Sequence, residues 1–130
     1  MPQFGTAINC MDGRVQEPVM NWLKSSYDLQ YVDEITEPGP TKLITSKDPT
    51  VVDALKAKVL ISVERHGSRL VALAAHGDCA GNPIPREASI RQVLEGLEVI
   101  RSWNLPVRIV GLWVDVETRQ VDKVGAIEPE

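Results

Sequence analysis

Cysteine is nearly absent from this sequence, which holds only Cys10 and Cys79 among its 130 residues. In a reducing compartment, two cysteines far apart in the sequence indicate metal binding or thiol reactivity more than a disulfide. The alternative is that both are ordinary buried thiols, since free cysteine is a common small residue in protein cores. The position of each cysteine relative to the predicted strands therefore decides between these roles.

Long apolar runs and an excess of basic residues are also lacking. No segment approaches the roughly 20 apolar residues that a membrane helix needs, and residues 1–10 lack the basic region and apolar core of a secretory signal. Lys and Arg number 14 and Asp and Glu number 18, so the net charge of −4 gives no electrostatic footprint for nucleic acid. We therefore expect a cytoplasmic protein that binds neither a membrane nor a nucleic acid.

Internal repeats and low-complexity segments are absent as well. A chain of this length fits one domain, 1–130, and such a domain buries roughly two-thirds of the surface that the unfolded chain exposes. We expect a single domain with its own hydrophobic core.

What the sequence does contain is an alternation of strand and helix patterns. The expected elements are a strand at 6–10, a helix at 15–27, a strand at 29–35, a loop at 36–45, a helix at 48–67, a strand at 69–76, a helix at 86–103 and a strand pair within 107–125. This order indicates an α/β fold with right-handed crossovers. We predict a mainly parallel open sheet of about five strands flanked by helices, with strand order 2-1-3-4 and a terminal antiparallel hairpin strand.

Two of these segments are especially clear. The segment 48–67 has an aspartate before a proline at its start, apolar residues at helical intervals and Gly67 as its stop. His66 lies near that end, where a cation favours the helix terminus, so we do not predict it as a metal ligand. The segment 69–76 is apolar almost throughout, which is typical of a central strand covered on both faces.

Potential metal ligands stand at the ends of two strands. Cys10 ends the first strand, and His76 and Cys79 follow the third. Ligands of an open parallel sheet bind beyond the carboxyl ends of the strands, where the strand order reverses, so these side chains meet if strands one and three are neighbours. Two cysteines and a histidine suit zinc (Zn2+), and three protein ligands leave a fourth position open, as in catalytic sites. The alternative to metal binding is that His76 is an ordinary histidine of a loop.

Asp12 and Arg14 lie in the turn that leaves the first strand. A carboxylate two residues from a ligand can accept a hydrogen bond from metal-bound hydroxide, or it can become the fourth ligand and close the site. A bidentate pair with Arg14 would decide between these roles. The alternative is an ion pair that only stabilises the turn.

Asp78 and Asn82 are weaker candidates in the loop after the third strand. Asp78 could accept the ring N–H of a ligand histidine, but capping the following turn is equally compatible with its position. The three tryptophans, Trp22, Trp103 and Trp113, fall on different elements, which favours packing over a stacking platform.

The motifs "CMDGR" (10–14) and "HGDC" (76–79), together with the late stretch "GLWVDVETRQVDKV" (111–124), resemble the β-class carbonic anhydrases. That family has Cys-x-Asp-x-Arg after its first strand, His-x-x-Cys after an apolar strand, and a final hairpin. The resemblance follows the order of elements along nearly the whole chain.

This resemblance implies a zinc lyase that hydrates carbon dioxide to bicarbonate by attack of zinc-bound hydroxide. It implies zinc ligation by Cys10, His76 and Cys79, with Asp12 orienting the hydroxide and Arg14 as the partner of Asp12. It also implies a small-molecule substrate as partner. Separately, the thin core of a 130-residue chain and its mostly apolar strands lead us to expect a homo-oligomer, a dimer or larger.

The sequence departs from the family pattern after the second strand, where "TEPGPTKLI" (36–44) replaces an Arg-Asn-Ala-Gly-Asn-like stretch. Such a loop could admit another heterocumulene, carbonyl sulfide or carbon disulfide. A non-catalytic zinc protein, with Asp12 closing the fourth position, is the remaining alternative.

Overall fold

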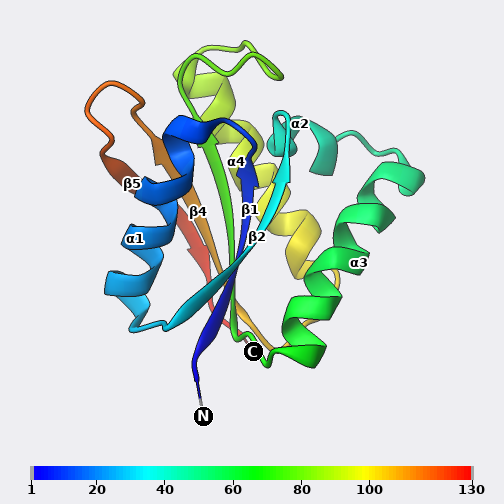
Figure 1. Ribbon diagram of the computed structural model, residues 1–130. Helices are drawn as coiled ribbons and strands as arrows, with labels where there is room; N and C mark the ends of the chain where they lie inside the picture. The colour runs from blue at the N-terminus through cyan, green and yellow to red at the C-terminus, as the bar shows by residue number, and fades with distance from the viewer. Residues whose placement is uncertain (1, 130) are drawn as a thin grey trace.

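The computed structural model describes residues 2–129. Its centre is a five-stranded sheet of order β2-β1-β3-β4-β5 (Figure 1). The strands are β1 (Phe4–Cys10), β2 (Tyr31–Glu37), β3 (Leu70–His76), β4 (Arg108–Val114) and β5 (Val121–Ile127). The first four are parallel and β5 is antiparallel to β4. The predicted α/β sheet, with order 2-1-3-4 and a terminal antiparallel strand, is confirmed.

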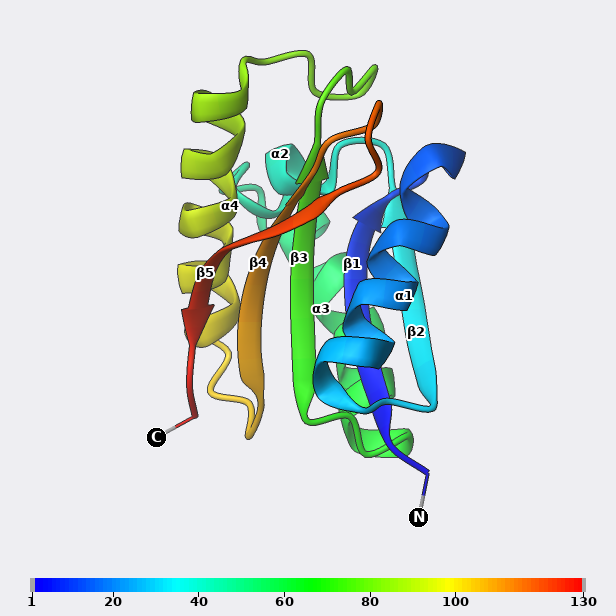
Figure 2. The same cartoon turned by 90° about the vertical axis from the view of Figure 1, so that its left-hand side faces the viewer.

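Helices cover both faces of the sheet (Figures 1 and 2). They are α1 (Gln16–Tyr27), preceded by the short 3-10 turn η1 (Gly13–Val15), then α2 (Pro40–Ile44), α3 (Pro49–Arg65) and α4 (Arg86–Arg101). The α1 helix lies on one face, and α2, α3 and α4 lie on the other. No helix among residues 2–129 has both the length and the apolar character needed to cross a membrane.

The core is divided into two layers by the sheet, because successive side chains of a strand point to opposite faces. On the α1 face, Val19 and Leu23 pack against Ala72 of β3. On the other face, Leu73 of β3 packs among residues of α3 and α4 such as Val59. All seven residues of β3 are buried, as expected for the apolar segment 69–76.

The segment predicted as the loop 36–45 contains one helical turn, α2, which corrects that prediction. Pro40 occupies the first turn, where its missing N–H needs no partner. Gly39 precedes it with a φ of +60°, a backbone conformation that favours glycine. Five residues are too few for a helical period to show in a sequence, so the two prolines indicated only a loop.

Candidate metal centre

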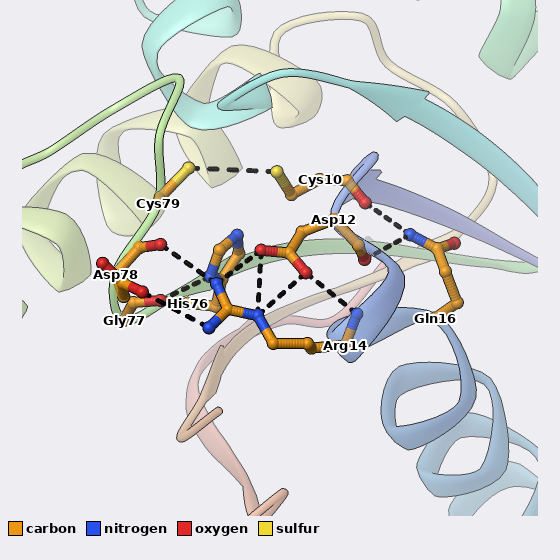
Figure 3. Close-up of polar contacts among 8 residues, drawn as sticks. All are labelled: Cys10, Asp12, Arg14, Gln16, His76, Gly77, Asp78 and Cys79. Atoms are coloured by element: carbon orange, nitrogen blue, oxygen red, sulfur yellow. Dashed lines mark hydrogen bonds and ion pairs between the residues drawn. The ribbon is translucent and has the colours of Figure 1, made fainter. Parts of the chain in front are cut away.

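Cys10, His76 and Cys79 converge at the carboxyl end of the sheet (Figure 3). Cys10 is the last residue of β1 and His76 is the last residue of β3, and these strands are hydrogen-bonded neighbours. One potential ligand atom from each of the three residues lies within 4.8 Å of the others, and all three residues are buried. The predicted meeting of these side chains between strands one and three is therefore observed.

The hydrogen bonds of His76 fix the tautomer of its ring. Its Nδ1 lies 2.6 Å from the carbonyl oxygen of Gly77, which can only accept, so Nδ1 carries the proton. The other nitrogen, Nε2, is buried without a hydrogen-bond partner among the described residues, and it points towards the two sulfurs (Figure 3). A buried acceptor left unsatisfied costs about 1–3 kcal/mol, which a metal ion would offset.

The spacing of the two sulfurs also fits a metal ion. Cys10 Sγ and Cys79 Sγ are 3.8 Å apart. Two corners of a tetrahedron with zinc–sulfur bonds of about 2.3 Å are separated by roughly 3.8 Å. Burial, and then the neighbouring Cys10, raises the pKa of the Cys79 thiol. A thiolate–thiolate–imidazole set selects zinc over magnesium or calcium, and metal binding would displace the thiol protons.

Asp12 is held by Arg14 through several hydrogen bonds (Figure 3). The guanidinium donates from Nη2 to Asp12 Oδ2 at 2.7 Å and from Nε to Oδ1 at 3.1 Å, and the Arg14 backbone N–H donates to Oδ1 at 2.9 Å. These bonds lower the pKa of Asp12 to about 2, so the carboxylate is ionised at neutral pH. Both carboxylate oxygens are engaged, and Asp12 is not part of the converging group of ligand atoms found among the described residues.

Arg14 also fastens the turn after β1 to the loop after β3. Its Nη1 lies 3.3 Å from Asp78 Oδ2, and its Nη2 donates to the Asp78 carbonyl at 3.2 Å. The carboxylates of Asp12 and Asp78 raise the pKa of Arg14 above its usual range. The suggestion that Asp78 accepts the ring N–H of His76 is wrong, because the Gly77 carbonyl takes that role and Asp78 turns towards Arg14 instead.

Two further residues that the sequence analysis did not identify position the turn. The Gln16 amide donates to the carbonyls of Cys10 at 2.6 Å and Asp12 at 3.0 Å. The buried Asn9 amide donates to the Val15 carbonyl at 3.1 Å. The partners of both are backbone atoms, which any residue supplies, so no sequence motif marks these contacts.

A polar network closes the far side of the cluster. Asn82 Nδ2 donates to Gln92 Oε1 at 2.6 Å and to Thr41 Oγ1 at 3.3 Å, and Thr41 donates to Gln92 at 2.9 Å. Asn82, a weak candidate in the sequence, is therefore part of this network. The cavity between the network and the cluster holds about 10 Å³, which is close to the space of one water molecule.

Close packing of Gly39 against Gly81 and Asn82 also encloses this side of the cluster. A Cβ on Gly39 would lie 2.8 Å from Asn82 Cβ and 2.9 Å from the Gly81 carbonyl oxygen. A larger, open depression of about 390 Å³ lies on the other side, against Asp12, Arg14 and the β4–β5 turn. The cluster is thus enclosed towards α2, and the open depression is lined by Asp12 and Arg14 but by none of the three potential ligands.

His66 lies away from the cluster, as predicted. It caps the carboxyl end of α3, and its Nδ1 is 2.7 Å from Asp33 Oδ2. Its ring also stacks on Phe4. Of the tryptophans, Trp113 is buried in the core against Gly77, and Trp22 and Trp103 pack at the edges of the two core layers.

Comparison with known proteins gives a consistent result. The sequence profile of the family described as "Putative carbonic anhydrase" matches residues 1–125. No curated protein matches the chain significantly.

Several solved structures share the fold. One of two tetrameric β-carbonic anhydrases from Sordaria macrospora is 14% identical with a TM-score of 0.62, over 97% of this chain and 82% of that chain. Carbonic anhydrase from Streptococcus mutans is 19% identical with a TM-score of 0.63, over 96% and 86%. The Coccomyxa β-carbonic anhydrase, solved with acetazolamide, is 15% identical with a TM-score of 0.58, over 98% and 74%.

Proposed function

The chain belongs to the carbonic anhydrase family whose profile matches residues 1–125, and on that premise we propose that it is a zinc-dependent lyase which hydrates carbon dioxide to bicarbonate. The observation that carries the proposal is the buried Nε2 of His76, which has no hydrogen-bond partner among residues 2–129 and points at two cysteine sulfurs 3.8 Å apart. Cys10, His76 and Cys79 would hold the zinc ion. The ion would lower the pKa of a bound water towards about 7 and so supply a nucleophile near neutral pH.

Asp12 would orient that nucleophile. It is ionised, so it can accept a hydrogen bond, and Arg14 holds both of its oxygens in a fixed direction. A carboxylate engaged in this way is restrained from ligating the metal, which favours an open fourth position over a site closed by Asp12. Arg14 therefore acts as a positioning residue in this proposal.

We also propose that the protein is a homo-oligomer in the cytoplasm. The Sordaria proteins of the same fold are tetrameric, and two thiolate ligands favour a reducing compartment. Light scattering on the purified protein measures the assembly directly, and a single monomeric mass at micromolar concentration would contradict it.

The test of the function combines metal analysis with an activity assay. Protein purified without chelators should contain about one zinc per chain. In a stopped-flow assay with a pH indicator, hydration of carbon dioxide should rise with pH along a single titration, and acetazolamide, which the Coccomyxa structure contains, should inhibit it.

Three outcomes of this test separate the alternatives. Absence of any transition metal contradicts the metal centre and favours buried thiols. Zinc without hydration, but with hydrolysis of carbonyl sulfide or carbon disulfide, reassigns the substrate. Zinc without any of these activities between about pH 6 and 9 favours a non-catalytic zinc protein.

A further inference from the structure

A second cavity of about 320 Å³ lies at the opposite end of the sheet from the metal centre. It is on the α1 face, beneath the carboxyl end of α1, where β1, β3 and β4 begin and the chain leaves β5 (Figure 2). We infer that this cavity binds a small organic carboxylate, with its charged group against Arg69 and Arg108 and its apolar body against the aromatic and aliphatic lining. The proposed function uses none of the residues that line this site.

The two arginines are brought together by the pairing of β3 with β4. The Arg108 backbone N–H donates to the Arg69 carbonyl at 2.9 Å, and both side chains line the cavity. The Arg69 guanidinium contacts the Ser68 carbonyl at 3.3 Å, and no ion pair to a carboxylate is found for it among residues 2–129. One guanidinium fork is therefore available, and such forks bind carboxylates in a bidentate manner.

One carboxylate already occupies part of this cavity. Glu128, in the segment after β5, accepts a hydrogen bond from Arg108 Nε at 2.8 Å. Among residues 2–129, the lining holds two guanidiniums and one carboxylate, which is one excess positive charge, although the whole chain has a net charge of −4. The Glu128 contact shows that Arg108 can bind a carboxylate here, and it makes Glu128 a competitor for a bound anion.

The rest of the lining is mainly apolar, and it includes Phe4, Leu29 and Leu70. The Arg108 guanidinium lies 5.6 Å from the centre of the Tyr27 ring, a cation–π distance that restrains its position. A volume of this size is at the lower end of small-molecule sites, which combine an apolar wall with a few placed polar groups. The lining thus favours an anion with an apolar body over an inorganic ion.

The test uses benzoate as the probe. It is titrated into the purified, zinc-containing protein at constant ionic strength, with calorimetry for affinity and amide NMR shifts for position. We expect saturable binding that shifts the signals of Leu70 and Tyr27, and binding of benzamide, which lacks the charge, weaker by about tenfold or more. Inorganic phosphate should bind no more tightly than benzamide.

Variants of exposed residues separate the site from general charge effects. Arg69→Gln should weaken benzoate binding about tenfold or more, whereas Glu128→Gln should strengthen it severalfold by freeing Arg108. Arg91→Gln removes an exposed arginine of α4 that does not line the cavity, and it should leave the affinity unchanged. Circular dichroism and Tm establish that each variant is folded.

Several results would overturn the inference. The first is that benzoate does not bind, or binds no more tightly than benzamide or phosphate. The second is that Arg69→Gln and Arg91→Gln change the affinity equally. The third is that the NMR shifts are confined to Gly77 and Ala75 beside the metal centre. Because the two sites share no lining residue, failure here leaves the proposed zinc activity untouched, and loss of zinc activity leaves this site testable.

Discussion

The two histidines lie at opposite ends of the same sheet and differ in their hydrogen bonds. His76, at the carboxyl end, is 5% exposed, and one of its ring nitrogens has no partner among the described residues. His66, at the amino end, has a side chain that is 44% exposed and bound to Asp33 at 2.7 Å. The more deeply buried histidine is thus the one with a ring nitrogen that neither solvent nor a described residue reaches, whereas the half-exposed ring of His66 is open to water.

The neighbours of His66 continue the contrast. Ser62 donates to Asp33 at 2.7 Å and contacts the hydroxyl of Thr6, which donates to Ser68 at 2.8 Å. We call Thr6, Asp33, Ser62, His66 and Ser68 the amino-end network. Ser68 in turn donates to a backbone carbonyl, so each buried hydroxyl of the network has a partner among the protein atoms.

The difference in hydrogen bonding between the two ends of the sheet indicates a structural role for the amino-end network and a ligand-binding role for His76. Buried polar groups in folded proteins are normally hydrogen-bonded, and a network that satisfies itself specifies and stabilises the fold. The buried Nε2 of His76 has no such partner among the described residues, and its position beside two cysteine sulfurs suits it to ligate a metal ion. We therefore expect changes at the amino-end network to reduce stability and changes at the carboxyl end to reduce metal binding or activity.

The largest effect is expected from Cys79→Ser. A serine hydroxyl is a poor ligand for zinc, so bound zinc should fall from about one to below about 0.1 per chain. Ser62→Ala, in the amino-end network, is the matched change and should keep its zinc. Elemental analysis measures both, and equal zinc content in the two variants would remove the distinction between the two ends.

Arg14→Ala is expected to lower hydration activity by about 10- to 100-fold, the usual range for a residue that orients a metal site. The zinc should stay, because Cys10, His76 and Cys79 are unchanged, while Asp12 becomes free to bind the metal. Asp78→Ala is the control, since it removes the second partner of Arg14 and leaves the Asp12–Arg14 pair. If Arg14→Ala is as active as the parent, Arg14 does not position Asp12.

Asp33→Ala should lower the free energy of unfolding by about 1–3 kcal/mol, because it leaves the Ser62 hydroxyl and the His66 ring without their acceptor. Zinc content and activity should not change. Asp53→Ala, at an exposed position of α3, should stay within about 0.5 kcal/mol of the parent. Urea unfolding measures both, and zinc loss in Asp33→Ala would show that the two ends are coupled.

The smallest effect concerns Glu34 of β2. Desolvation raises its pKa to about 7 from an ordinary value of 4.5, although the residue is exposed to solvent and the Asn9 amide opposes the shift. Between those pH values the folded chain holds a proton that the unfolded chain has released, so this residue makes stability fall as pH rises from about 4.5 to about 7, and the penalty is constant at higher pH. Below pH 4.5 the penalty is absent.

Glu34→Gln cannot ionise, so its stability relative to the parent should increase from pH 5 to pH 8. Comparing urea midpoints of the two proteins at each pH cancels the other titrating groups. A difference that does not change with pH would mean that Glu34 titrates normally. Unchanged zinc content in Glu34→Gln would show that Glu34, like the amino-end network, has a structural role.

The strand order and the meeting of three donors were predictable from local patterns. The apolar segment 69–76 identified a central strand, and Cys10 and His76 stood at the ends of their strands. Parallel strands place their carboxyl ends at one edge, so adjacency of the first and third strands was enough to bring the donors together. The pairing of Asp12 with Arg14 was likewise anticipated, because the two residues share one turn.

Contacts between distant segments were not predictable in this way. Asp78 pairs with Arg14, and Asn82 joins Gln92 and Thr41, because packing of the loops decides which polar side chains come within hydrogen-bond distance. The same holds for the amino-end network. For each of these residues the sequence contains several chemically equivalent partners, and no sequence pattern shows which of them forms the hydrogen bond.

The sequence by itself determined the periodicity of most elements, the residues at which β1 and β3 end and the chemistry of the donors, since these depend on near neighbours. Only the tertiary structure decided that His76 keeps one nitrogen without a partner among residues 2–129, that Arg14 also reaches Asp78, and that Arg69 and Arg108 share a cavity. The physical reason is the short range of hydrogen bonds and packing forces. They act over a few ångströms, so they are fixed only when segments far apart in the chain are placed side by side.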